Sequence, residues 1–124
     1  IIMNSVQAMP GGGQLEISMR QVNAPRKNAA LLGRSELMDF VEIVIRDTGM
    51  GIKKEDLNKI FIPFYTTKTD WEGTGLGLSV VNRIINDLEG VIEVESEPGE
   101  GAKFIIRLPA LERNTRIQTK AASA

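Results

Sequence analysis

Apolar residues recur at helical spacing in three parts of the chain. Residues 1–9 (IIMNSVQAM) are apolar at positions 1, 2, 3, 6, 8 and 9, which predicts a short helix that Pro10 ends. A second helix is predicted over 78–88, with Gly90 as a left-handed C-cap. A third and shorter helix is predicted over 53–61. All three would turn an apolar side toward a common core.

Strand patterns occupy four other parts of the chain. Residues 14–22 (QLEISMRQV) alternate apolar and polar side chains, as a half-buried strand does. Residues 40–47 (FVEIVIRD) are more continuously apolar and predict a more buried strand. Two further strands, 91–97 and 102–108, are joined by the turn residues PGEG and predict a hairpin.

The segments between these elements are predicted as connections. Residues 23–37 are polar, and Pro25 argues against a strand where they begin. Residues 61–77 form a loop too long to serve only as a connection. After Pro109 the pattern is weak, so we divide the chain into a domain over 1–109 and a tail over 110–124.

The order of elements (helix, strand, strand, helix, helix, hairpin) predicts a two-layer α/β sandwich. One sheet would carry the helices on one face, and its free face would be the more polar one. The chain begins with Ile1 inside a helical pattern, so we interpret it as part of a longer polypeptide.

Composition narrows the chemistry. At 124 residues the chain is expected to form one domain, and its 15 basic and 16 acidic side chains leave no basic excess for nucleic acid. No apolar run is long enough to span a membrane, and the sequence contains no cysteine. Histidine is absent too, which excludes the commonest general base and any acceptor histidine on this chain. Chemistry must come from carboxylates, amides, hydroxyls, lysines and the backbone.

Three features are candidates for that chemistry. The glycines of GTGLG, 73–77, come directly before a predicted helix, where backbone N–H groups can hold phosphate; the alternative is a hinge. Asp47 ends an apolar strand and could accept a hydrogen bond from an adenine amine; the alternative is an ordinary turn. Asn4 could ligate Mg²⁺ through its amide oxygen, or could simply be a packing or capping residue.

Taken together and in this order, these motifs resemble the ATP-binding catalytic domain of bacterial sensor histidine kinases. That family shares the Bergerat (GHKL) fold with DNA gyrase, mismatch-repair ATPases and a chaperone. NSVQAMPGGGQLEI is similar to the N box, DTGMGI to the G1 box, FIPFYTTK to the F box and GTGLGLSVVNRII to the G2 box. The ending GVIEVESEPGEGAKFIIRLP resembles the closing hairpin. The resemblance implies a mixed, mostly antiparallel sheet whose N-terminal strands lie upstream of this chain.

The resemblance also implies residue roles. Asn4 would coordinate Mg²⁺ at the phosphates, Asp47 would bind the adenine amine, and Lys68 would meet the γ-phosphate. Phe61 and Phe64 would anchor a lid formed by the loop between Phe64 and the glycines. The other residues implied at the nucleotide are Gln7, Gly49, Gly51, Ile52, Thr66, Thr67, Gly73, Thr74, Gly75, Leu76, Gly77 and Leu78.

One departure and several alternatives accompany this interpretation. The closing hairpin has Ala102 where the family usually has a hydroxyl that helps to hold a water near the adenine. Our hypothesis is phosphoryl transfer from MgATP to a histidine on a separate dimerisation domain of the same polypeptide, with a response regulator downstream. The domain would work in the cytoplasm without contacting the membrane itself, although the parent protein could be anchored there. The alternatives are a gyrase-type ATPase, a serine-kinase module, or a nucleotide-responsive module without transfer.

Overall fold

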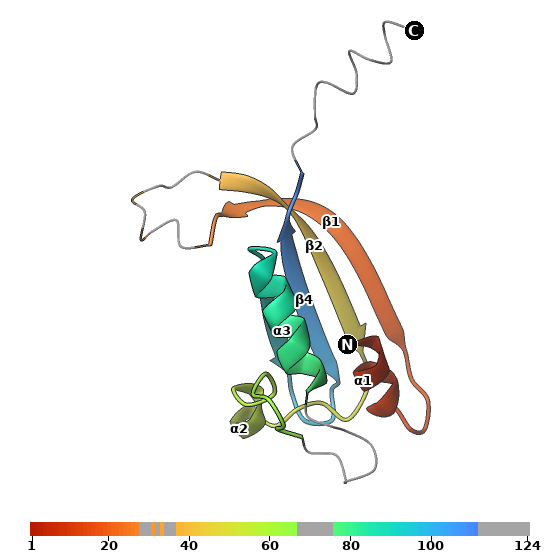
Figure 1. Ribbon diagram of the computed structural model, residues 1–124. Helices are drawn as coiled ribbons and strands as arrows, with labels where there is room; N and C mark the ends of the chain where they lie inside the picture. The colour runs from red at the N-terminus through yellow and green to blue at the C-terminus, as the bar shows by residue number, and fades with distance from the viewer. Residues whose placement is uncertain (28–30, 32, 34–36, 67–75, 112–124) are drawn as a thin grey trace, which may run out of the picture.

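A computed structural model of the chain describes residues 1–27, 31, 33, 37–66 and 76–111. Within these residues, helices lie against one face of a single four-stranded sheet (Figure 1). The elements are α1 (Ile2–Gln7), β1 (Leu15–Pro25), β2 (Leu37–Asp47), α2 (Lys54–Leu57), α3 (Gly77–Asp87), β3 (Val91–Ser96) and β4 (Ala102–Pro109). The predicted helix-on-sheet architecture is confirmed.

The strand order is β1-β2-β4-β3, and each neighbouring pair is antiparallel. The predicted hairpin is the β3–β4 pair, in which Val94 lies opposite Phe104. The connector predicted to begin at residue 23 is wrong, because β1 continues to Pro25, opposite Leu37 on β2. A proline is tolerated there because β1 is an edge strand of the described sheet.

The helix-side face of the sheet carries the core. Ile45 of β2 and Ala102 and Phe104 of β4 form a buried cluster near one end of the sheet. α1 contacts β2 and α3 contacts β3, so this side of β1 is less covered (Figure 1). Accordingly Ile17 and Met19 are 53% and 69% exposed, although they alternate as a buried face would.

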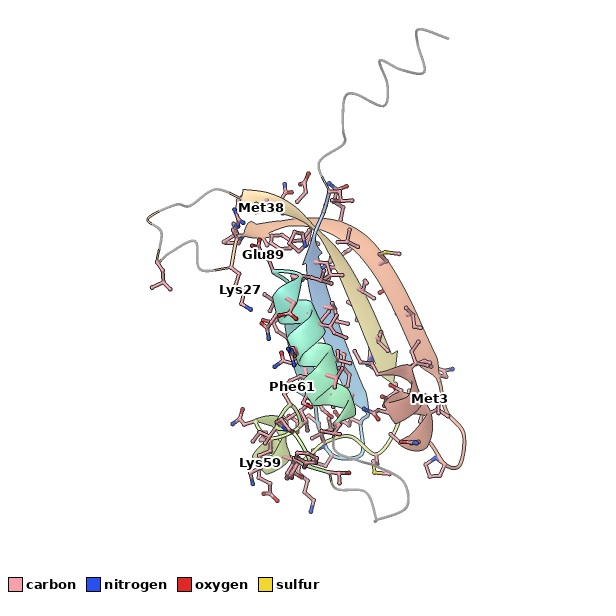
Figure 2. All side chains as sticks on the ribbon, in the orientation of Figure 1. Met3, Lys27, Met38, Lys59, Phe61 and Glu89 are labelled. Carbon is pink, nitrogen blue, oxygen red and sulfur yellow. The ribbon has the colours of Figure 1, made fainter. Side chains whose placement is uncertain are left out.

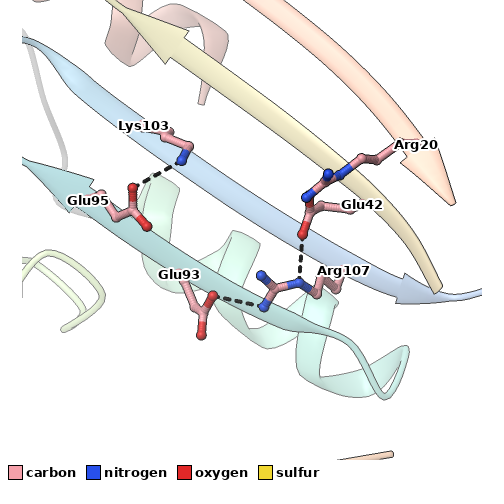
Figure 3. A network of polar contacts seen from close by, with 6 residues as sticks. All are labelled: Arg20, Glu42, Glu93, Glu95, Lys103 and Arg107. Atoms are coloured by element: carbon pink, nitrogen blue, oxygen red, sulfur yellow. Dashed lines mark hydrogen bonds and ion pairs between the residues drawn. The ribbon is translucent and has the colours of Figure 1, made fainter. Parts of the chain in front are cut away.

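The opposite face of the sheet carries a charged network, as expected of the more polar face, beside the buried Phe40 and Ile105. Glu42, only 4% exposed, accepts hydrogen bonds from Arg20 Nε and Arg107 Nε at 2.8 Å each (Figure 3). Arg107 also reaches Glu93 at 2.9 Å, so the network crosses all four strands. The hydrogen bonds from Arg107 and Arg20 lower the pKa of Glu42, against the opposing effect of burial.

The end of α3 differs from the prediction. The left-handed residue is Glu89, with φ of 59°, and not Gly90. The amide of Glu89 donates to Asn86 O at 2.9 Å and that of Gly90 to Ile85 O at 2.8 Å, the pattern of a Schellman motif. Position 90 needs glycine for another reason, since a Cβ there would lie 2.6 Å from Arg107 O.

Candidate functional site

Asp47 is the buried carboxylate at the end of β2. It is 2% exposed, and its Oδ1 accepts hydrogen bonds from Gly49 N at 2.9 Å and Ala102 N at 3.2 Å. Within the described part of the chain, no hydrogen bond reaches its other oxygen, Oδ2. Two amides therefore hold this carboxylate in place and leave one oxygen available to a donor.

The two glycines after Asp47 bring three backbone segments together. A Cβ on Gly49 would lie 2.7 Å from Ala8 O at the end of α1. Gly51 has φ of +73°, and a Cβ there would lie 2.1 Å from Glu97 O in the β3–β4 turn. Between them, Met50 N donates to Ala8 O at 3.1 Å and Met50 O accepts from the turn. The glycines are needed because this loop is packed between α1 and the hairpin.

Ile52 closes the same loop from the other side. Its amide donates to Ser96 Oγ at 2.8 Å, and that hydroxyl donates to Gly101 O at 2.7 Å. Its side chain packs against the cluster of Ile45, Ala102 and Phe104. Ile52, one of the predicted nucleotide residues, therefore joins the loop after Asp47 to the buried cluster.

Asn4 and Gln7 lie one turn apart on α1, at the same end of the sheet (Figure 1). Asn4 is half-buried and Gln7 is exposed, and both take part in polar interactions within the structure. The helix reaches the Asp47 loop through Ala8, whose carbonyl accepts the Met50 amide. Asn4 therefore belongs to the helix that contacts the loop after Asp47.

The start of α3 has the features expected of an anion-binding helix end. Its N-cap is Leu76, whose own side chain makes no capping hydrogen bond. Gly77 is exposed, and among the described residues a Cβ added to it would meet nothing within 4 Å. Leu78, the next residue, packs on the same cluster that adjoins Asp47. The first turn of α3 and the Asp47 loop therefore border one end of the core.

Only one of the two phenylalanines predicted to anchor the loop after α2 does so among the described residues. Phe61 packs against the core cluster, near the first turn of α3 in Figure 2. Phe64 is 74% exposed and has φ of 68°, so the prediction that it anchors the loop is wrong in this structure. Tyr65 is the second attachment, through a hydrogen bond from its hydroxyl to Asp56. That bond raises the pKa of Tyr65.

The remaining predicted nucleotide residues lie at or beyond the end of the described segment. Thr66 is exposed at the edge of the described segment. The following predicted residues lie outside the described residues: Thr67, Lys68, Gly73, Thr74 and Gly75. Their roles stay predictions.

A hollow of about 300 Å³ adjoins Asp47 on the charged side of the sheet. Its lining includes Arg46, Glu95 and Lys103, which share the outward face of their strands, together with the β3–β4 turn. Neither Asn4 nor Gly77 lines it. This hollow therefore differs from a pocket that would join Asp47 to α1 and α3.

Sequence reasoning missed two residues at this site. Gly101 has φ of +83°, and a Cβ there would lie 2.0 Å from Asp47 O, so the hairpin can approach Asp47 only through a glycine. Ala102 matters through its amide, although the sequence drew attention only to its lack of a hydroxyl. The available signal was the second glycine of PGEG, which a simple two-residue turn does not need.

None of the helices within the described residues has the length and apolar character needed to cross a membrane.

Comparison with known proteins agrees with this architecture. The family model HATPase_c, described as histidine kinase-, DNA gyrase B- and HSP90-like ATPase, matches residues 1–112. Sensor kinase CckA of Brucella abortus (strain 2308) is 45% identical over 118 residues, which cover 94% of this chain and 12% of that protein. The chain thus spans about an eighth of the length of this relative.

Solved structures of histidine kinases are similar to this chain as well. The catalytic domain of histidine kinase ThkA, in a nucleotide-free form, superposes with a TM-score of 0.61 at 30% identity, covering 87% of this chain and 60% of that one. Full-length ShkA in complex with AMPPNP gives a TM-score of 0.50 at 34% identity, covering 56% of this chain and 14% of that one. On the matched motifs, the sheet and these relatives, the chain belongs to the family of histidine kinase-, DNA gyrase B- and HSP90-like ATPases, on its sensor histidine kinase branch.

Proposed function

We propose that residues 1–109 form the ATP-binding catalytic domain of a sensor histidine kinase, with residues 110–124 as a tail. The observation that supports this most is the Asp47 carboxylate, which two amides hold through one oxygen, while its other oxygen accepts no hydrogen bond from the residues that the structure describes. Burying such a group is costly unless a donor meets it, and the exocyclic amine of adenine is such a donor. The AMPPNP complex of the similar protein ShkA supports an adenine nucleotide as the ligand.

The triphosphate would extend from Asp47 toward the first turn of α3. The backbone amides of this turn and the exposed Gly77 suit phosphate oxygens, and the helix dipole favours negative charge at that end. Leu76 and Leu78 would flank this turn, with Gly73, Thr74 and Gly75 before it. Lys68, with Thr66 and Thr67 beside it, would neutralise the γ-phosphate.

Magnesium fits the donors that α1 offers. Mg²⁺ keeps several waters and takes few protein ligands, so one amide oxygen beside phosphate oxygens is a suitable set. Asn4 would supply that oxygen, and Gln7 would face the phosphates from the next turn. When bound, the ion would neutralise phosphate charge and help to orient the γ-phosphoryl group.

The γ-phosphoryl group would pass to a histidine outside this chain, since its 124 residues contain none. The acceptor would lie on a dimerisation domain of the same polypeptide, and a response regulator would receive the group afterwards. Because ATP is the donor, the domain would work in the cytoplasm. The contribution of this chain would be positioning and charge neutralisation.

Two experiments test this function. In the first, the chain is titrated with AMPPNP in Mg²⁺ and in EDTA by calorimetry, and we expect saturable binding that Mg²⁺ strengthens. Asn4→Ala should abolish the Mg²⁺ effect, whereas Asn23→Ala, on exposed β1, should keep it. The absence of saturable binding to the wild type would exclude the proposal.

In the second experiment, the parent protein with its upstream region is incubated with ATP labelled at the γ-phosphate. Acid-labile label on a histidine supports a kinase. Release of free phosphate without protein label would support the gyrase-type ATPase instead, and label on serine would support the serine-kinase alternative.

A further inference from the structure

β1 is an edge strand whose outer side is unpaired. It comes first in the order β1-β2-β4-β3, and within the described residues no strand pairs with its other side (Figure 1). It pairs with β2 residue for residue from Leu15 to Pro25, so it contains no bulge, and its one proline is its last residue. Bulges and prolines are among the devices that keep an exposed edge from pairing with another chain. The 11-residue edge of β1 is therefore open to the addition of a strand.

Alternate residues of β1 direct their backbone N–H and C=O groups away from β2. Just before the strand, Gln14 O accepts a hydrogen bond from Thr48 N at 3.2 Å, so Gln14 faces β2. Because the direction alternates along an antiparallel strand, the even-numbered residues of β1 face β2 as well. The odd-numbered residues present their donors and acceptors to the open side: Leu15, Ile17, Met19, Gln21 and Asn23.

The exposed side chains of β1 are apolar on one face and charged on the other. Ile17 and Met19 lie on the helix side of the sheet, where each is more than half exposed. On the other face, Glu16 forms no ion pair within the described residues. Arg20 contacts Glu42 through Nε and Nη2, which leaves the hydrogens of Nη1 for another acceptor. The two charges on this edge have opposite signs, so they can attract a second strand of the same sequence.

A second copy of β1, running antiparallel, complements these side chains when a two-fold axis passes through the exposed Ser18. In that register Glu16 lies opposite Arg20 of the second copy. Ile17 likewise lies opposite Met19 of the second copy, and both of these residues have outward-facing backbone groups that can pair. Symmetry repeats each contact, so one edge pairing forms two ion pairs and two apolar pairs.

Other registers lose this complementarity. Moving the axis to Ile17 or Met19 removes both ion pairs. Moving it to Glu16 or Arg20 places like charges directly opposite each other, which is unfavourable. An axis between two residues would set outward-facing residues against residues that face β2, and no ladder of hydrogen bonds could form. The sequence of β1 therefore favours one register with itself.

We propose that β1 is the docking edge for a second copy of this chain, in an antiparallel β1–β1 pairing centred on Ser18. The two four-stranded sheets join into one continuous sheet, with the helices of both copies on the same face. A strand edge buries much less area than the roughly 1,600 Å² of a stable complex, so the dimer is weak, with a Kd on the order of 100 µM. The pairing goes beyond the proposed function and does not require nucleotide.

Proline substitutions test the backbone pairing. In this register Gln21 N donates to Leu15 O of the second copy, twice in each dimer. We expect Gln21→Pro to raise the dimer Kd about 30-fold through the loss of two neutral hydrogen bonds, measured by sedimentation equilibrium on the 124-residue chain. Asn23→Pro is the matched control, because its N–H also points outward but its partner would be Gly13, outside β1. It should dimerise like the wild type, since an edge strand tolerates proline.

Glu16→Arg tests the ion pairs and leaves the backbone unchanged. It replaces two attractive pairs with two pairs of like charge, so we expect the dimer Kd to rise about 30-fold at low salt and less at high salt. Glu100→Arg makes the same change of charge at an exposed position in the β3–β4 turn and should leave the Kd unchanged.

Crosslinking tests the register, because the chain contains no cysteine of its own. Ser18→Cys places two thiols at the axis, in a non-hydrogen-bonded pair whose Cα atoms are about 4.5 Å apart, which a disulfide can join. Asn23→Cys places them roughly 30 Å apart along the paired strands. With copper phenanthroline as the oxidant, we expect a crosslinked dimer from Ser18→Cys and none from Asn23→Cys.

Each contrary result overturns the inference. A wild type that stays monomeric up to about 1 mM has no such pairing. A dimer that persists in both Gln21→Pro and Glu16→Arg is held by another surface, such as the helix side of the sheet. Ser18→Cys that crosslinks no faster than Asn23→Cys excludes the register. Circular dichroism reports whether the proline variants fold, and if Gln21→Pro does not, Glu16→Arg and the crosslinking decide. Because no assay contains nucleotide, failure here leaves the proposed function standing.

Discussion

Replacing Asp47 with asparagine separates the proposed adenine-binding role of this residue from its structural role. Asparagine keeps an oxygen that can accept from Gly49 N and Ala102 N, now as two neutral hydrogen bonds in place of two charge-assisted ones. Charge roughly doubles the strength of such bonds, so we expect a loss of about 1 kcal/mol in the free energy of unfolding. The variant should therefore still fold.

Binding should suffer far more than folding. The new amide nitrogen replaces the oxygen that has no hydrogen bond in the described structure, and it would present hydrogens to the hydrogens of the adenine amine. Losing a hydrogen bond to a charged group costs about 3 kcal/mol, or ~150-fold in Kd. Urea denaturation gives the first quantity, and calorimetric titration with AMPPNP in Mg²⁺ gives the second.

Asp47→Ala is the contrasting variant. It leaves both amides buried and unpaired, at about 1–3 kcal/mol each, so it should lose much more stability than Asp47→Asn. The reasoning is refuted if Asp47→Asn binds the nucleotide as tightly as the wild type. It is refuted as well if the alanine and asparagine variants have the same urea midpoint.

Three further variants test the fold around the site. Glu42→Gln should lower stability by about 2 kcal/mol at neutral pH. Arg107 and Arg20 lower the pKa of Glu42. The stabilisation that Glu42 provides is therefore complete above the ordinary pKa of 4.5 and is lost as the pH falls through the lowered pKa. The urea midpoints of the variant and the wild type should accordingly converge in acid. Gly51→Ala should cost about 3 kcal/mol through its positive φ and the 2.1 Å backbone clash, whereas Gly11→Ala, with nothing within 4 Å, should melt like the wild type. Glu89→Gly should raise the free energy of unfolding by about 0.5 kcal/mol, and with it the melting temperature, because relief of a left-handed residue outweighs the loss of an exposed ion pair. A melting temperature below that of the wild type would show that the ion pair matters more.

The residue pattern predicted the parts of the site that local sequence controls. A nearly continuous apolar run identified the strand that ends at Asp47, and the 78–88 pattern with the glycines before it identified α3 and its start. Each of these features depends on neighbours within a few positions. A single sequence contains that information.

The contacts that complete the site depend on residues far apart in the chain. Ala102 donates to a carboxylate 55 positions earlier, and nothing in an alanine indicates that its amide has this partner. Similarly, Gly90 is a glycine because Arg107 O approaches it, so its identity misled the assignment of the left-handed residue at Glu89. Phe64 shows the same limit, since an aromatic side chain does not indicate by itself whether it is buried.

The hydrogen bond from Ala102 to Asp47 has a consequence for how the molecule acquires activity. Because β4 supplies this amide, a nascent or truncated chain that ends before β4 has only the Gly49 amide to orient the acid at position 47. Closing so large a loop belongs to the late, cooperative part of folding. Under the proposed function, nucleotide affinity should therefore appear together with the complete sheet, and nucleotide should protect β4 from proteolysis as strongly as it protects the Asp47 loop.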